Sequence, residues 1–204
     1  MNTFKKKLIY YGKDILLTYV YVIVCSLIGI ILSWATVAGL MEGFVCAMLS
    51  VVNMALYFIV ITHSFMKTAE DAMRVKHSND LERRTMLKER YYRELDKVSE
   101  YNPRKLIVYI LPMIIPIVLL LVVAGILALC NVSTYAIEVM LKILYGFIYS
   151  FAFGIKEGAS AYWTAFAIVL TIAPIVVGYV KGCNNVKKEY ERVEKIKQVI
   201  DGDK

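Results

Sequence analysis

Few residues in this chain have the types and the spacing that catalysis or metal binding requires. The 204 residues include two histidines, His63 and His77, and the four cysteines form no C-x-x-C pair. A zinc site, a nucleophile with its base, and a phosphate-binding or dinucleotide-binding loop each have a recognisable motif, and the sequence contains none of them. We therefore expect a protein that is not an enzyme and that holds no metal and no cofactor.

The most prominent polar residue lies inside an apolar stretch. Asn53 is near the middle of the segment 43–66, which has no Asp, Glu, Lys or Arg. Ser50, three residues earlier, and Tyr57, four residues later, would share its helical face. An asparagine in a membrane helix commonly forms a hydrogen bond with a neighbouring helix. The alternative is that these three side chains line a polar groove inside the bilayer.

A second candidate site is a pair of charges in the apolar run 135–155. Glu138 and Lys142 are one helical turn apart, so they are spaced to form an ion pair. Pairing would lower the cost of holding both charges in or near lipid. We take them as a candidate pair on the outer side of the membrane.

A short repeat singles out two further glutamates. Gly39-Leu-Met-Glu-Gly43 recurs as Gly154-Ile-Lys-Glu-Gly158, so Glu42 and Glu157 occupy matching positions. Transporters often contain such half-repeats. The simpler explanation is that glycine is common at helix ends in membranes.

The elements that position these residues follow from the distribution of charge. A helix needs roughly 20 apolar residues to cross the hydrocarbon core, and only helices or closed barrels can cross it. No alternating pattern of apolar and polar residues suggests a barrel. Four stretches of 23 to 32 residues lack any Asp, Glu, Lys or Arg: 15–41, 43–66, 106–137 and 158–180. We predict an all-α polytopic membrane bundle with spans at about 15–36, 43–66, 106–130 and 158–180.

The basic residues predict the orientation of these spans. Residues 1–14, 67–105 and 181–204 contain 22 of the 24 Lys and Arg, which leaves Lys142 and Lys156 for the other side. By the positive-inside rule, both termini and the 67–105 loop are cytoplasmic in a protein of the cell membrane. The basic residues alternate with acidic ones at membrane flanks, so the net charge of +7 does not indicate nucleic-acid binding.

We divide the chain accordingly. It has a basic N-terminus (1–14), a first transmembrane pair (15–66), a cytoplasmic loop (67–105), a second pair (106–180) and an amphipathic tail (181–204). The outer segment 131–157 allows three interpretations: an interfacial amphipathic helix, a re-entrant segment or a fifth span. A fifth span would worsen the split of basic residues to 17 against 7. We prefer a membrane-embedded or interfacial helix.

The cytoplasmic loop has helical periodicity. Apolar residues recur at Leu87, Tyr91, Leu95 and Val98, and His77-Ser78-Asn79-Asp80 has the composition of a break with an N-cap. We predict a helical hairpin that ends at Asn102-Pro103. The tail has a similar stripe, listed as Val186, Tyr190, Val193, Ile196 and Ile200. The two stripes either pack on each other or receive a soluble partner.

The order of these features over residues 43–180 resembles that of the YidC-type membrane insertase superfamily. The matching parts are a span with a central polar residue, Met66-Lys67 at its exit, and the charged hairpin closed by Asn102-Pro103. A span with Leu111-Pro112-Met113 and Pro116 and a last span with a basic tail follow. The resemblance implies a hydrophilic groove open to the cytoplasm and lipid, with a hairpin that helps receive an inserting chain. Bacterial members have an arginine where Asn53 lies, and 131–157 is too short for their outer two-helix hairpin.

Three functions follow as hypotheses. The first is a non-enzymatic protein that assists insertion or assembly of client membrane proteins, with Asn53 and Ser50 in the groove. The second, motivated by the repeat, is a small-solute transporter or a membrane subunit of one. The third is a structural accessory subunit that binds a cytoplasmic partner through the amphipathic stripes.

Overall fold

The computed structural model of the chain describes residues 3–89, 100–155 and 166–202. These residues form six α-helices and no strand, which confirms the all-α prediction. The helices are α1 (Thr3–Val37), α2 (Gly43–Glu89), α3 (Lys105–Leu129), α4 (Tyr135–Leu144), α5 (Gly146–Ile155) and α6 (Ala167–Gly202).

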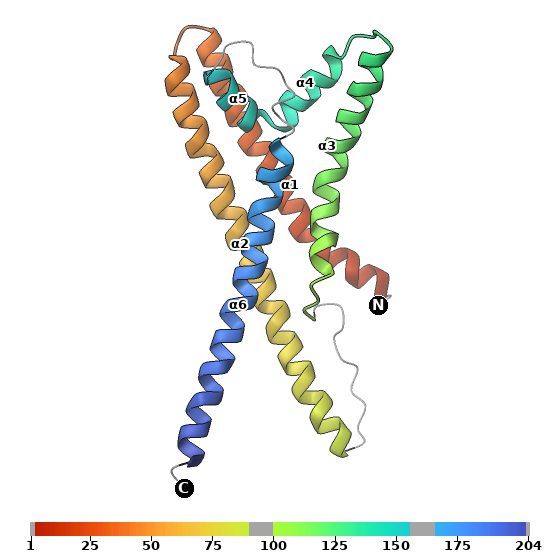
Figure 1. Cartoon of the computed structure of the whole chain (residues 1–204), viewed down its shortest axis with the longest axis vertical. Helices are drawn as coiled ribbons and strands as arrows, with labels where there is room; N and C mark the ends of the chain where they lie inside the picture. Colours follow the sequence, from red (N-terminus) through yellow and green to blue (C-terminus); the bar gives the residue numbers. More distant parts are fainter. Residues whose placement is uncertain (1–2, 90–99, 156–165, 203–204) are drawn as a thin grey trace.

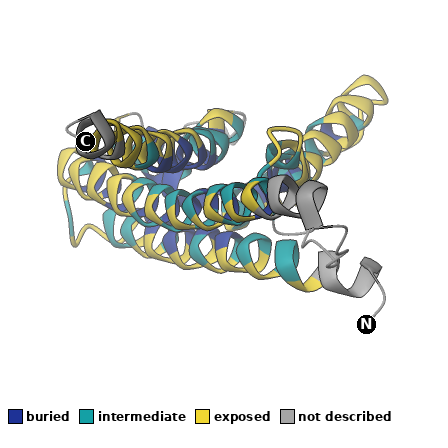
Figure 2. Cartoon of the chain, turned by 90° about the horizontal axis from the view of Figure 1, so that it is seen from below, coloured by how far each residue is buried: buried dark blue, intermediate teal, exposed yellow. Residues whose placement is uncertain are grey.

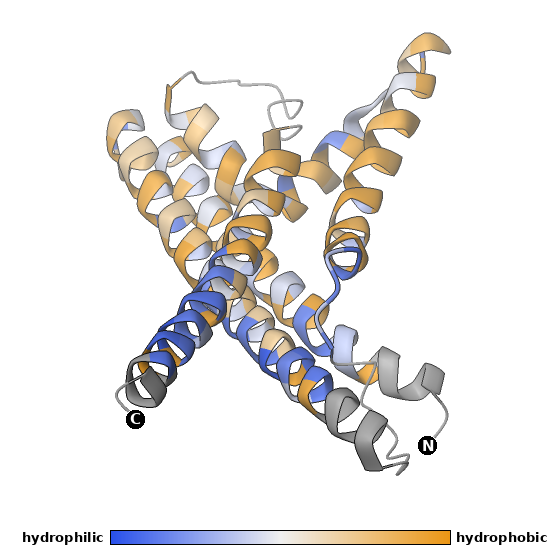
Figure 3. Ribbon diagram, turned by 60° about the horizontal axis from the view of Figure 1, so that its bottom comes forward, coloured by the Kyte–Doolittle hydropathy of each residue, from blue (hydrophilic) through white to orange (hydrophobic). Residues whose placement is uncertain are grey.

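Four helices are long and apolar enough to cross a membrane, namely α1, α2, α3 and α6. Each contains one of the predicted spans, apart from the start of the fourth, because residues 156–165 lie outside the described part. The outward faces of these helices are covered by aliphatic side chains such as Leu16, Ile31 and Ile59, all exposed in the isolated chain (Figure 3). A polytopic membrane protein accounts for this surface, since a soluble domain rarely exposes so large an apolar area.

Two of the helices are much longer than a membrane requires. A rise of 1.5 Å per residue makes the 47 residues of α2 about 70 Å long and the 36 residues of α6 about 54 Å. The hydrocarbon core is only about 30 Å thick. The two helices cross and then diverge toward the same end of the molecule (Figure 1). We call residues 67–89 of α2 and 181–202 of α6 the arms, and the end to which they point the arm side.

The segment between α3 and α6 is neither a single interfacial helix nor a continuous span. It consists of α4 and α5, which are bent by 104° at Tyr145. The segment α4 starts beyond the end of α3 and α5 ends where Gly154 touches Gly43 at the start of α2, so both ends lie opposite the arm side (Figure 1). A pair of helices bent in this way is either a broken span or a re-entrant loop, and two ends on the same side favour the re-entrant interpretation. We call Tyr135–Ile155 the re-entrant segment.

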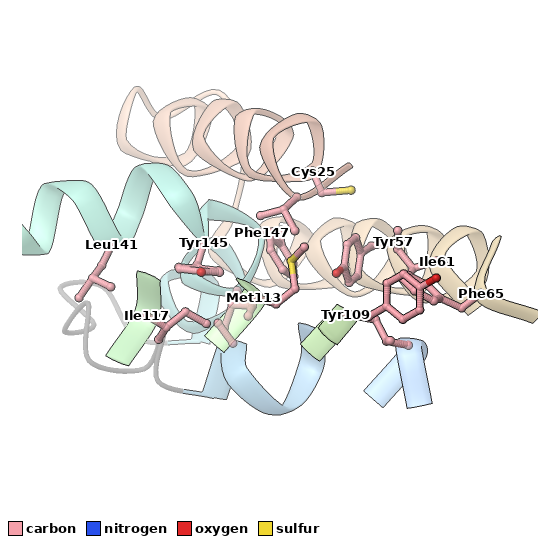
Figure 4. Close-up of a cluster of buried hydrophobic side chains, with 14 of the residues drawn as sticks. Cys25, Tyr57, Ile61, Phe65, Tyr109, Met113, Ile117, Leu141, Tyr145 and Phe147 are labelled. Atoms are coloured by element: carbon pink, nitrogen blue, oxygen red, sulfur yellow. The ribbon is translucent and has the colours of Figure 1, made fainter. Parts of the chain in front are cut away.

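The middle of the bundle is filled by large side chains. Tyr57, Ile61 and Phe65 of α2 meet residues of α1, α3 and the re-entrant segment there (Figure 4). The other labelled members are Cys25, Tyr109, Met113, Ile117, Leu141, Tyr145 and Phe147, and none is more than 6% exposed. Buried residues gather where the helices pack against one another, and exposed residues lie on their outer turns (Figure 2). Lipid is as apolar as these side chains, so burying them gives little hydrophobic gain. The van der Waals contacts of this packing hold the helices together instead.

The predicted break in the cytoplasmic loop is wrong. The segment α2 continues without interruption through His77–Asp80 to Glu89. Asn79 does not cap a helix, because its side chain is buried and its Nδ2 donates to Glu100 Oε2 at 3.1 Å. That tertiary contact outweighs the weak tendency of asparagine to end helices. The first part of the predicted second helix, through Glu89, is the continuation of α2, and residues 90–99 lie outside the described part.

Candidate functional site

Backbone contacts through glycine hold the re-entrant segment against α1 and α2. A Cβ atom added to Gly146 would lie 2.5 Å from the Ser26 carbonyl oxygen in α1, and one added to Gly29 would overlap the Gly146 carbonyl. At the other end of α5, a Cβ on Gly154 would lie 2.6 Å from the Gly43 carbonyl oxygen in α2. These helices therefore approach more closely than any side chain would permit.

Hydroxyl groups complete this interface. The Ser26 Oγ donates to the Leu144 carbonyl at 2.7 Å, and that carbonyl lies where α4 ends. The hydroxyl oxygens of Ser50 in α2 and Ser150 in α5 are 2.8 Å apart. Each also lies within hydrogen-bonding distance of a carbonyl in its own helix. The backbone break inside the membrane is thus satisfied by neighbouring helices, which is the condition under which such a break is tolerated.

Asn53 joins α1 to α2. Its Nδ2 donates to the Cys25 carbonyl oxygen at 2.8 Å, and its side chain is 4% exposed. Ser50 is likewise fully buried against α5. The polar face predicted from the sequence therefore exists, but its first two members bond to neighbouring helices instead of facing an opening.

Tyr57, the third residue of that face, lies deeper in the core. Its ring packs on Phe147 with centroids 5.4 Å apart, and its hydroxyl lies close to Thr171 of α6. The hydroxyl oxygen is buried and has no hydrogen-bond partner among the described residues. The ring of Tyr57 fills the space between α2 and the re-entrant segment.

The first prediction concerns Asn53. Replacing it with alanine should lower the free energy of unfolding by about 0.6 kcal/mol, the average for an interhelical hydrogen bond in a membrane. The loss of stability stays small because the Cys25 carbonyl lies inside the regular helix α1 and keeps its helical hydrogen bond. Steric trapping in bicelles would measure it, with Ser33→Ala as the control, since the Ser33 Oγ bonds only to Gly29 in its own helix. Equal losses in the two variants would contradict the interhelical role.

The predicted ion pair between Glu138 and Lys142 does not form. The Thr134 hydroxyl, one turn before Glu138, donates to its Oε1 at 2.9 Å. The Lys142 Nζ lies 4.9 Å from the ring centroid of Tyr149 in α5. Each charge has another partner: Thr134 donates to the carboxylate at the first turn of α4, and the bend brings the Tyr149 ring to the ammonium. Both positions also suit the helix dipole.

The repeat does not correspond to a repeated structure. Glu42 lies exposed in the turn before α2, while Glu157 and Gly158 lie outside the described residues. Under the repeat, α1 would match the re-entrant segment, yet α1 is one continuous helix and the re-entrant segment is bent by 104°. The segment α5 packs mainly on α1 and α2. The bent re-entrant segment is therefore not a structural copy of α1.

The helices α2 and α6 meet at a second glycine contact, at the base of the arms. A Cβ on Gly178 would overlap the Thr62 carbonyl, and one on Gly182 would overlap the Met66 carbonyl. Just beyond, the Asn185 Nδ2 donates to Glu70 Oε1 at 2.9 Å. These contacts fix the crossing of α2 and α6.

Beyond the crossing, polar contacts between α2 and α6 continue. Arg74 and Glu189 form an ion pair of 3.5 Å, and the His77 ring stacks on Tyr190 with centroids 3.7 Å apart. Further along, Leu81 on α2 and Val193 and Ile196 on α6 are exposed. In the tail stripe, Val186 is buried and Tyr190 meets His77, whereas Val193 and Ile196 are exposed. Tyr91, Leu95 and Val98 of the loop stripe lie outside the described residues, so packing between the two stripes stays a prediction.

Sequence reasoning missed two contacts at the arm side of the bundle. The Thr68 hydroxyl donates to Asp14 Oδ2 at 3.1 Å, which ties α1 to α2. The Tyr19 hydroxyl donates to the Pro112 carbonyl at 2.5 Å. That contact had a signal in the sequence, because Pro116 has no N–H and leaves the carbonyl four residues earlier without its helical partner.

A cluster of aromatic rings closes the same end. Tyr101, in the turn before α3, stacks on Tyr179 of α6 with centroids 5.7 Å apart and lies under the Lys76 ammonium. Burial raises the pKa of Tyr101 to about 12, so its phenol stays protonated at physiological pH. The cluster packs together α3, α6 and the turn before α3 at the base of the arms.

The described residues contain no group of three His, Cys, Asp or Glu side chains placed to hold a metal ion. The arrangement offers instead two kinds of surface: a re-entrant segment fixed by glycines, and a pair of arms that diverge into solvent. Comparison with protein-family models, with curated proteins and with solved structures finds no match to this chain.

Proposed function

We propose that this protein assists the insertion or assembly of other membrane proteins and that its arms are the surface that receives them. The observation that carries the proposal is the pair of helices α2 and α6, which leave the bundle together and diverge (Figure 1). A helix that extends well beyond the bilayer has no role in spanning it. The distribution of basic residues supports placing the arms in the cytoplasm, where new membrane proteins are made.

The surface chemistry of the arms supports a protein partner. Charges of both signs cover them, with apolar side chains exposed between the charges at Leu81, Val193 and Ile196. Val193 and Ile196 are three residues apart, so they lie on one helical face. Apolar residues at this spacing are typical of a helix that binds another protein through one apolar face. The partner would be a groove or an amphipathic helix of the client.

The proposal differs from an insertase that works through an open polar groove. Asn53 and Ser50 are used in helix packing, and large side chains fill the middle of the bundle. The same two observations do not favour transport, which needs a path through the centre. The membrane-embedded part is better understood as a rigid base that positions the arms.

A cross-linking experiment tests this proposal. A photoreactive amino acid at Ile196 or Leu81 should form adducts with nascent membrane-protein chains during translation in the presence of vesicles that contain the full chain. Val169, an exposed apolar position on the membrane-embedded part of α6, is the matched control. Adducts at Ile196 that appear only while ribosomes are translating membrane proteins would support the proposal. Adduct levels at Ile196 no higher than at Val169 would overturn it.

A structural accessory subunit is the second candidate, because the polar residues of α2 serve packing. It predicts a different outcome of the same experiment. The arms would then cross-link to one mature protein, and translation would not change the yield. The two functions are therefore separated by whether adduct formation depends on translation.

A further inference from the structure

Lys142 is a charged residue in an unusual place. It lies in the last turn of α4, three residues before the bend at Tyr145. Its ammonium lies over the ring of Tyr149, which follows the bend in α5. A lysine on one limb that touches an aromatic ring on the other must point into the angle between them. The ammonium is therefore held on the inner side of the re-entrant bend, and that angle opens opposite the arm side (Figure 1).

No carboxylate neutralises this ammonium within the part of the chain that the structure describes. The nearest acid along the helix, Glu138, accepts a hydrogen bond from Thr134 and forms no ion pair with Lys142. An aromatic face attracts a cation but carries no net charge. An ionisable side chain in a membrane segment is costly unless a partner compensates it. Among the described residues the partner of this ammonium is the Tyr149 ring, and an anionic ligand would compensate its charge.

We propose that Lys142 binds the phosphate of a phospholipid headgroup in the angle between α4 and α5. The re-entrant segment begins and ends at the surface opposite the arms. The angle between α4 and α5 therefore opens toward the lipid headgroups of that leaflet, which carry phosphate groups. An ammonium is a compact donor of up to three hydrogen bonds and suits phosphate oxygens. Tyr149 keeps the lysine side chain aimed into the angle, and exposed apolar residues of the segment, such as Met140 and Ile143, can contact acyl chains.

The test measures lipid-dependent stability of the full chain in nanodiscs. Discs of a neutral, phosphate-free galactolipid receive increasing fractions of phosphatidylglycerol, and Tm is followed. A ligand that binds only the folded protein raises Tm by mass action. We expect Lys142→Gln to need about tenfold more phosphatidylglycerol for the same rise, because it loses a charge-assisted hydrogen bond. Lys142→Arg should keep the response, and Tyr149→Leu should weaken it.

Two controls define the result. Lys181→Gln removes an exposed lysine on the arm-side half of α6 and should respond like the wild type. Inorganic phosphate added to the galactolipid discs tests the soluble form of the same anion. An equal response of Lys142→Gln and the wild type to phosphatidylglycerol would overturn the proposal. So would full stabilisation by inorganic phosphate alone, since the lipid would then not be the source of the anion. The Tm in pure galactolipid discs shows whether each variant folds.

Discussion

Replacing Gly182 with valine is expected to separate the two arms at their crossing and to lower the free energy of unfolding by about 3 kcal/mol. The Cβ of any larger residue would overlap the Met66 carbonyl and would lie 3.0 Å from the Ala69 Cβ. The obstacle is backbone in the middle of α2, so it cannot be relieved by a change of rotamer. The helices must move apart, which loses the buried contacts of Ala69, Val186 and Cys183 together.

The measurement combines unfolding with a distance between the arms. Steric trapping gives the free energy of unfolding, and electron-spin labels at Leu81 and Ile196 report how far the arms diverge. Gly125→Val is the matched control, because Gly125 also lies inside an apolar helix but a Cβ there would meet nothing within 4 Å. A loss of stability as large in Gly125→Val as in Gly182→Val would show that valine itself, and not the crossing, is responsible.

The spans of this protein could be predicted from sequence because the bilayer imposes a simple condition. A crossing helix must avoid charge over about 20 residues, and this requirement is local. The predicted spans 43–66 and 106–130 accordingly begin within one residue of α2 and α3. The same reasoning located Asn53 and Ser50 on one helical face, since the period of a helix is fixed.

What each polar residue contacts could not be predicted, because the partners come from distant parts of the chain. Asn53 bonds to a carbonyl 28 residues earlier, and Ser50 meets a serine 100 residues later. Spacing alone favoured an ion pair between Glu138 and Lys142, but the bend at Tyr145 brings the Tyr149 ring to the lysine instead. Similarly, His77–Asp80 has the composition of a helix end, yet a hydrogen bond from Asn79 keeps α2 continuous.

The partners of the glycines could not be predicted from the sequence either. Gly39, Gly43, Gly154 and Gly158 were paired within a repeat, whereas the contact is between Gly43 and Gly154 of the two different motifs. A small residue marks where a helix permits close approach, but it does not identify which helix approaches. The sequence therefore shows the capacity for tight packing, and the structure shows that this capacity is used to seat the re-entrant segment and to cross the arms.

Replacing Gly146 with valine is expected to displace the re-entrant segment from α1, again at a cost of about 3 kcal/mol in the free energy of unfolding. A Cβ at this position would lie 2.5 Å from the Ser26 carbonyl oxygen and 2.9 Å from Ile30 Cγ1. The side chain of Ile30 can turn away, but the carbonyl belongs to the α1 backbone. As α5 moves, the hydrogen bond from Ser26 to Leu144 is lost, and a carbonyl at the end of α4 is left unpaired inside the membrane.

Labelling of a single cysteine would detect this displacement. In a cysteine-free background, Ile148→Cys places a thiol at a position that is only 4% exposed, so a lipid-soluble maleimide should react with it slowly. Adding Gly146→Val should speed that reaction, because α5 no longer lies against α1. Ala136→Val, on the exposed face of α4 in the same segment, is the control and should leave the rate unchanged. If Gly146→Val left both the labelling rate and the stability at their wild-type values, the contact between Gly146 and Ser26 would not hold the re-entrant segment against α1. The bend that places Lys142 over Tyr149 would then have to be fixed by other contacts.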